Sequence, residues 1–109
     1  MVRFPFDDLS SSKVRPALCL AGPVGPRNQV VRAFITSRDV AVTLLPSDIV
    51  LSPNQAEFSQ TGLQRSSTIR LHRLVTLGVQ LITRELGVLD SVRMRDMERK
   101  LAELFQLAR

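Results

Sequence analysis

The segment KVRPALCLA at residues 13–21 is central to this sequence, because a polar stretch runs directly into an apolar run at Arg15-Pro16. Proline fixes its own φ and pushes the preceding residue into an extended conformation. We therefore expect Arg15 at the mouth of a β-strand that covers residues 17–21. A guanidinium offers five donors in a rigid fork that suits a phosphate. An Arg-Pro pair alone is more often a surface arginine beside an edge-strand proline. Whether Arg15 binds phosphate therefore depends on the residues in the rest of the chain.

Composition indicates one soluble domain over residues 1–109 with an anionic partner. Hydrophobic residues make up 44% and charged residues 23% of the chain, so we expect one core and no global disorder. The 15 Lys and Arg residues outnumber the 10 Asp and Glu residues, and the net charge of +5 favours nucleic acid without proving it. One cysteine and one histidine exclude a disulfide framework or a zinc cluster. With no signal peptide or membrane-spanning run in sight, we expect a cytoplasmic protein.

Apolar and β-branched runs predict a series of short strands. A first, short strand at residues 2–4 is followed by a Ser/Asp-rich loop at residues 6–13. Further strands are expected at residues 29–36, 40–45, 49–51, 68–77 and 82–88. In the strand at 68–77 we expect Ile69, Leu71, Leu74 and Val75 to face the core.

Two helices are expected among these strands. Ser52-Pro53 resembles an N-cap followed by a first-turn proline, and predicts a short helix to about Gln60 that Gly62 would close. From Asp90, apolar residues recur at helical spacing at Met94, Met97, Leu101, Leu104, Phe105 and Ala108. Either Asp90 or Ser91 could cap this second helix. Short strands closed by one terminal helix predict a mainly β, α+β fold, built as a small barrel or a strongly bent sheet.

Two polar strand ends are expected to meet. Arg15 opens one strand, and Thr36 ends the next strand along the chain. Antiparallel neighbours joined by a turn place the start of one strand beside the end of the other. A guanidinium beside a threonine hydroxyl could bind one phosphate group.

Five segments follow one another along the chain: KVRPALCLAG, VVRAFITSRD, LLPSDIVL, TGLQRSSTIRLHRLVTL and LITRELGVLD. In that order they resemble the MazF/PemK-like toxins of type II toxin–antitoxin systems over nearly the whole chain. The resemblance implies an SH3-like small β-barrel of the MazF/PemK/CcdB type, which is usually a homodimer. It also implies a sequence-specific, metal-independent endoribonuclease that cleaves single-stranded RNA, an mRNA interferase, without a cofactor and neutralised by a cognate antitoxin.

By position, the catalytic arginine of this family falls on Arg15 and its catalytic threonine on Thr36. Cleavage without metal requires the ribose 2′-hydroxyl to attack the adjacent phosphorus, and both side chains can donate hydrogen bonds to the phosphate oxygens. Neither residue is an ordinary general base. The resemblance implies that Arg15 nevertheless takes part in proton transfer.

Residues that flank this pair are expected to bind RNA. They are Ser12 and Lys13 before Arg15, and Ser37 and Arg38 after Thr36. Single-stranded RNA is commonly read by stacking its bases on aromatic or arginine planes. Because the chain has no Trp or Tyr, arginine is the expected stacking partner.

Three other features of the sequence have both a functional interpretation and a simpler structural one. His72 is the only histidine, the residue type most often used as a general base, but we expect it to have a structural or interface role. Asp7 and Asp8 are expected to be solvated turn residues, not a catalytic pair. Met94 and Met97 are expected to pack in the core or a dimer interface.

The sequence is also compatible with a non-catalytic function. Family members normally begin with a Gly-Asp or Gly-Glu pair in a longer first strand, which this chain lacks. The chain could therefore be a degenerate toxin that binds only antitoxin or nucleic acid. A CcdB-like gyrase poison shares the fold but depends on a tryptophan in its C-terminal tail, and this chain has no Trp.

Overall fold

The structure is a computed structural model that describes residues 5–9, 15–37 and 44–107. Its strands are β1 (Pro5–Leu9), β2 (Arg15–Val24), β3 (Gln29–Thr36), β4 (Asp48–Leu51), β5 (Ser67–Gly78) and β6 (Ile82–Val88). Two short 3₁₀ helices, η2 (Phe58–Thr61) and η3 (Val79–Leu81), and one α-helix, α1 (Ser91–Leu104), complete the described elements.

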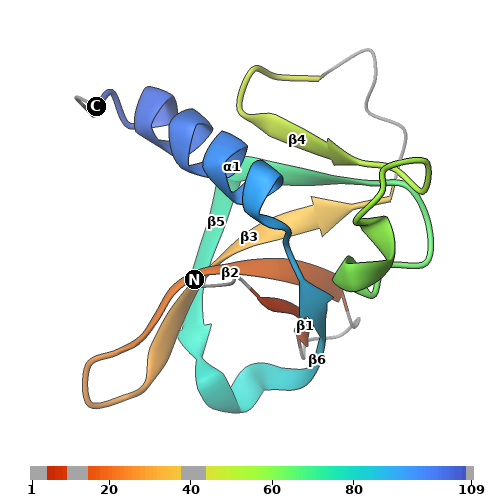
Figure 1. Cartoon of the computed structure of the whole chain (residues 1–109). Coiled ribbons are helices and arrows are strands. Elements are labelled where there is room, and N and C mark those ends of the chain that lie inside the picture. Colours follow the sequence, from red (N-terminus) through yellow and green to blue (C-terminus); the bar gives the residue numbers. More distant parts are fainter. Residues whose placement is uncertain (1–4, 10–14, 38–43, 108–109) are drawn as a thin grey trace.

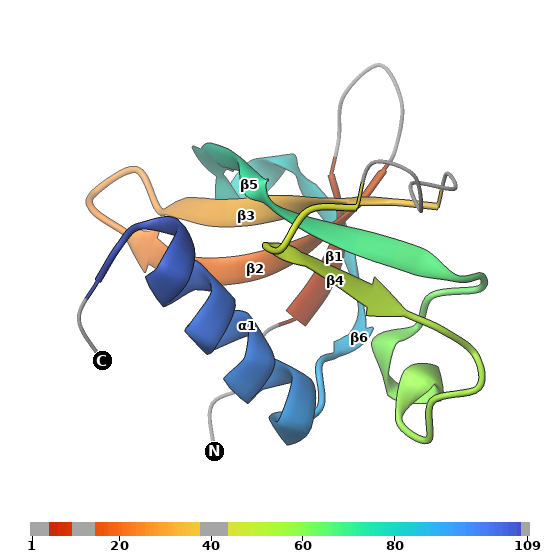
Figure 2. The same ribbon diagram turned by 90° about the horizontal axis from the view of Figure 1, so that it is seen from above.

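The strands form one antiparallel sheet in the order β4-β5-β3-β2-β1-β6, which curls strongly (Figure 1). Helix α1 lies across one side of the curled sheet, beside β4 and β5 (Figure 2). The mainly β fold with a C-terminal helix is the architecture expected from the sequence. Strands β3 and β6 have the predicted bounds. β3 is rich in β-branched and apolar residues, whereas β6 combines Ile82, Leu86 and Val88 with charged residues.

The core lies between α1 and the inner face of the sheet. It consists of ten buried residues: Leu18, Ala33, Ile35, Ile49, Leu51, Ile69, Leu71, Leu89, Met94 and Met97. Helix α1 supplies the two methionines, so their predicted packing role in the core is confirmed. Among the described residues, no helix is both long enough and apolar enough to cross a membrane.

The N-terminus of α1 forms as the sequence predicts. The side chain of Asp90 accepts a hydrogen bond from the backbone N–H of Arg93 at 3.2 Å, which satisfies a free donor of the first turn. The other end differs from the prediction, because Leu104 is 36% and Phe105 54% exposed. Both side chains therefore lie at the surface and not in the core.

The prediction of a loop at residues 6–13 is wrong for residues 6–9, the part of this segment that the structure describes. Residues 6–9 belong to β1, and Asp7 and Asp8 pair with Ala17 and Pro16 of β2. The same two residues pair on their other side with β6. Hydrogen bonding to strands on both sides outweighs the low strand preference of aspartate, so the interpretation as turn residues is also wrong. The predicted strand at residues 2–4 lies outside the described residues.

The helix predicted from Ser52 to Gln60 does not form. Residues 52–57 make turns, and only the short η2 follows. The side chain of Gln55 accepts from the backbone N–H of Ser52 and donates to the carbonyl of Val50, which stabilises the turn in place of a helix. Gly62 does close η2, in the left-handed conformation at φ 75° that favours glycine.

Two smaller predictions also need correction. Most of the strand expected at residues 40–45 lies outside the described residues, and Leu44 and Leu45 are not in a strand. Leu74 is 38% exposed instead of buried, whereas Ile69 and Leu71 are buried as expected. The register of β5 shifts between these positions, so side chains beyond Leu71 no longer follow the simple alternation.

Candidate functional site

Arg15 and Thr36 lie at adjoining strand ends. Arg15 begins β2, Thr36 ends β3, and Ala17 pairs with Phe34 between them. Continued by two residues, this register places Arg15 opposite Thr36. Residues directly opposite each other in antiparallel strands have Cα atoms about 5 Å apart. The convergence expected from the sequence is therefore present in the backbone.

Both residues belong to the face of the sheet that points away from the core. Leu18 and Ala33, which pair with each other, belong to the core cluster. Because side chains alternate along a strand, Arg15 and Thr36 lie on the opposite face. Arg15 is exposed and Thr36 is half-buried. A ligand can thus reach the guanidinium from solvent.

The expected RNA-binding residues are only partly described. Ser37 is exposed and follows Thr36 directly at the end of β3. Ser12, Lys13 and Arg38 lie outside the described residues.

Further side chains share the Arg15/Thr36 face and were missed in the sequence. Phe34 precedes Thr36 by two residues on β3, and Thr68 of β5 pairs with Thr36 directly. Strand alternation from Thr36 back to Phe34 and Arg32 was the available signal for the β3 residues. The contribution of β5 could not be found this way, because Thr36 and Thr68 are 32 residues apart and neither segment shows by itself that the two pair.

A bulge in β5 brings Arg73 onto Phe34. Phe34 pairs with Arg70, whereas the preceding Ala33 pairs with Leu74, so residues 71–73 are extra on the β5 side. The guanidinium carbon of Arg73 lies 5.6 Å from the centroid of the Phe34 ring, which is within cation–π range.

Asp48 forms a buried charge cluster beside this bulge. Its fully buried carboxylate has Oδ1 3.0 Å from Nε of Arg70, and Oδ2 accepts a hydrogen bond from the backbone N–H of Leu45 at 2.9 Å. The Arg70 contact lacks hydrogen-bond geometry, so attraction between opposite charges dominates it. Nδ1 of His72 lies 3.9 Å from Oδ1, and Nζ of Lys100 donates to the Asp48 carbonyl at 2.7 Å.

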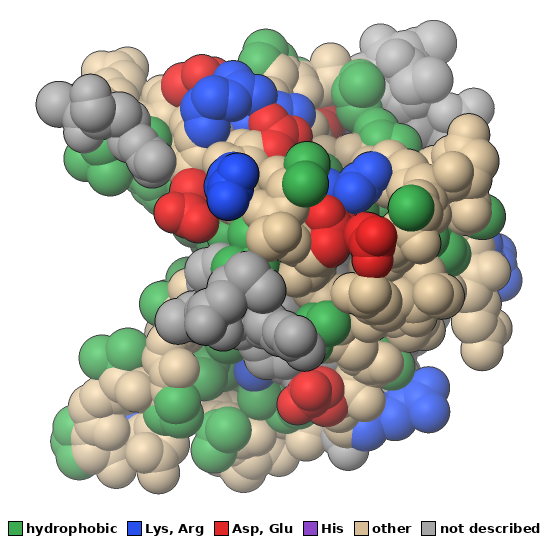
Figure 3. All heavy atoms as spheres, viewed as in Figure 1, with side chains coloured by type: hydrophobic (Ala, Val, Ile, Leu, Met, Phe, Trp, Pro, Cys, Tyr) green, Lys and Arg blue, Asp and Glu red, His purple; other side chains and the backbone are tan. Residues whose placement is uncertain are grey.

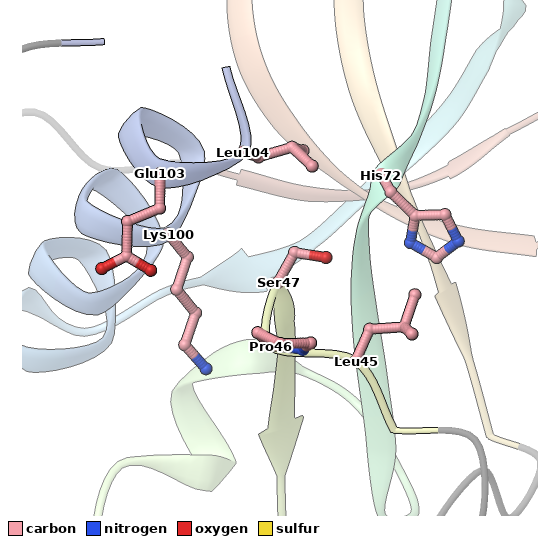
Figure 4. Close-up of a pocket in the computed structure, with 7 residues that line it drawn as sticks. All are labelled: Leu45, Pro46, Ser47, His72, Lys100, Glu103 and Leu104. Atoms are coloured by element: carbon pink, nitrogen blue, oxygen red, sulfur yellow. The ribbon is translucent and has the colours of Figure 1, made fainter. Parts of the chain in front are cut away.

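His72 also lines a shallow groove of about 320 Å³ between α1 and the turn before β4 (Figure 4). The groove is lined by Leu45, Pro46, Ser47, His72, Lys100, Glu103 and Leu104. His72 is four residues along β5 from Thr68, and β3 lies between β5 and β2. His72 therefore lies beside Asp48 and the groove at α1, on a strand that β3 separates from the strand of Arg15.

Cys19 and the acidic residues offer no metal site in the described part of the chain. Cys19 is buried, with its Sγ 3.9 Å from the carbonyl of Ala21. No three side chains of His, Cys, Asp or Glu come together among residues 15–37 and 44–107.

Comparisons with known proteins agree with this architecture. The MazF-mt6 toxin of Mycobacterium tuberculosis superposes with a TM-score of 0.76 at 20% identity, covering 96% of this chain and 99% of that one. An endoribonuclease in complex with its cognate antitoxin, from a mycobacterial species, gives 0.67 at 19% identity, covering 98% and 94%. A mycobacterial endoribonuclease gives 0.68 at 17% identity, covering 96% and 90%. No curated protein matches by sequence search.

The family assignment rests on a separate comparison of the sequence. The sequence model of the PemK-like, MazF-like toxins of type II toxin–antitoxin systems matches residues 1–105. That match spans every described strand and α1, and the solved structures share the same fold. This chain therefore belongs to the PemK-like, MazF-like toxin family.

Proposed function

We propose that this chain is an endoribonuclease that cleaves single-stranded RNA at specific sequences without a metal ion, with Arg15 and Thr36 as its catalytic residues. The observation that carries the proposal is the β2–β3 register, which sets an exposed arginine opposite a threonine on the outer face of the sheet. Family membership supports the same activity, since two similar solved structures are endoribonucleases.

The pair suits the chemistry of RNA cleavage. The 2′-oxygen forms a bond to phosphorus while the bond from phosphorus to the 5′-oxygen breaks, which leaves a cyclic phosphate and a 5′-hydroxyl. The 2′-hydroxyl loses a proton and the 5′-oxygen gains one. Arg15 and Thr36 would donate to the non-bridging oxygens, where negative charge increases in the transition state. Donors fixed at two strand ends need little reorganisation during the reaction.

The charge distribution favours RNA binding on the sheet side. Residues 90–104 contain four basic and four acidic side chains, which cancel. Figure 3 shows both signs interspersed over α1, and Arg99 pairs there with Asp96 and Glu103. Residues 1–89, which include the sheet, its loops and Arg15, therefore carry +4 of the net charge of +5, and Arg109 carries the rest. A phosphate backbone is attracted to that side.

The test is cleavage of a long single-stranded RNA by purified protein with EDTA present. We expect cuts at a restricted set of sequences at the same rate with and without the chelator. The cleaved ends should carry a cyclic phosphate and a 5′-hydroxyl. Activity that disappears with EDTA and returns with a divalent ion would contradict the proposed mechanism, and no cleavage under either condition would favour a binding-only toxin.

We further propose that the protein is a homodimer that binds a cognate antitoxin. Apolar side chains remain exposed at the end of the helix, with Leu104, Phe105 and Leu107 between 36% and 63% exposed. Burial of such surface stabilises association. Light scattering at micromolar concentration should give about twice the chain mass of 12.2 kDa, and a stable monomer would contradict the dimer. A similar endoribonuclease was solved in complex with its cognate antitoxin, which supports that partner.

A further inference from the structure

We propose that Arg73, held over the ring of Phe34, is a stacking site for the RNA base next to the phosphate bound by Arg15 and Thr36. The inference rests on the proposed function and adds a specificity-determining residue to it. Its basis is the contact of 5.6 Å between the Arg73 guanidinium carbon and the Phe34 ring centroid.

The position of Phe34 is suitable for a neighbouring base. Phe34 and Thr36 are two residues apart on β3 and therefore share one face of the sheet. Two residues of a strand span about 6.6 Å. A base is connected to its own phosphate through one ribose, so a nucleotide with its phosphate at Thr36 could place a base above Phe34.

The β5 bulge aims Arg73 at this position. Residues 71–73 have no partner on β3, and continuing the register of Ala33 with Leu74 by one residue sets Arg73 opposite Phe34. Bulges often occur beside active sites, where they redirect a side chain. Without these three extra residues, β5 would place only Arg70 opposite Phe34, and no second arginine would lie over the ring.

Arg73 is suited to stacking and Arg70 is not. Arg73 is exposed, and its guanidinium lies over the half-buried Phe34 ring. That contact limits the motion of the planar group before RNA arrives, so less entropy is lost on binding. Arg70 is only 16% exposed and contacts the buried Asp48 carboxylate. Arginine planes and aromatic rings are the usual stacking partners of unpaired bases.

The first experiment compares wild type, Arg73→Ala, Arg73→Lys and Arg95→Ala on a randomised single-stranded RNA pool, with the cut ends sequenced. Loss of the stacking contact with one base should reduce kcat/KM about tenfold in both Arg73 variants. It should also remove most of the base preference at one nucleotide beside the cut. Lysine keeps the charge but cannot stack, so its failure to rescue distinguishes stacking from attraction. Arg95 is exposed on α1, and its removal should leave the preference unchanged.

The second experiment does not depend on cleavage. Single-stranded 2′-deoxy oligonucleotides, which lack the attacking hydroxyl, would carry 2-aminopurine at successive positions. Wild type and Arg95→Ala should quench its fluorescence at one position, and both Arg73 variants should not. Quenching in wild type without RNA cleavage would overturn the proposed function but support the stacking site. Normal cleavage with wild-type base preference and quenching in Arg73→Lys would overturn the stacking site alone.

Discussion

Replacing Arg15 with alanine is expected to reduce RNA cleavage by at least about 10²–10³-fold, the usual effect of losing one preorganised donor to a charged transition state. The decrease should appear in kcat, because the donor matters most when charge develops on the phosphate. The fold should persist, since Arg15 is exposed at the first position of β2 and contributes nothing to the core cluster. Single-turnover cleavage of a labelled RNA, with circular dichroism as a check on folding, measures both effects.

Two other substitutions act as controls for Arg15. Thr36→Ala should reduce the rate less, because threonine supplies one neutral hydrogen bond, and Thr36→Ser should restore part of it. His72→Gln should keep most activity, since His72 lies beside Asp48 and the groove near α1. An inactive His72→Gln protein with an active Arg15→Ala protein would assign the catalytic role to the histidine instead.

Replacing Asp48 with alanine is expected to lower the free energy of unfolding by about 3–5 kcal/mol. The Asp48 side chain is fully buried, and its loss leaves the mostly buried Arg70 guanidinium without its counter-charge. The backbone N–H of Leu45 also loses its acceptor. Domains of this size are stable by only about 5–15 kcal/mol, so about a fifth or more of the total would be lost. Urea denaturation at neutral pH measures the change.

Asp96 provides the matched control for Asp48. Its side chain is 35% exposed on α1 and pairs with Arg99 and Lys100. Because water screens such surface pairs, Asp96→Ala should change the free energy of unfolding by no more than about 1 kcal/mol. Equal losses in the two variants would show that burial of the Asp48 charge cluster is not what stabilises β4 against β5.

The local sequence pattern was sufficient to predict several elements of the fold. Strands β3 and β6 and the start of α1 follow from residue type, because β-branched runs and a capping aspartate act within a few neighbouring residues. Pro16 likewise places Arg15 at the start of β2. The same local reasoning failed at residues 52–60, where the side chain of Gln55 stabilises turns against a helix.

The meeting of Arg15 and Thr36 follows from chain order, since a hairpin brings the start of one strand beside the end of the next. Three other features depended on the tertiary structure: the inclusion of Asp7 and Asp8 in β1, the β5 bulge that sets Arg73 over Phe34, and the burial of Asp48. Each requires contact between segments distant in sequence. Their free energy comes from strand pairing and charge burial that no local window of residues contains.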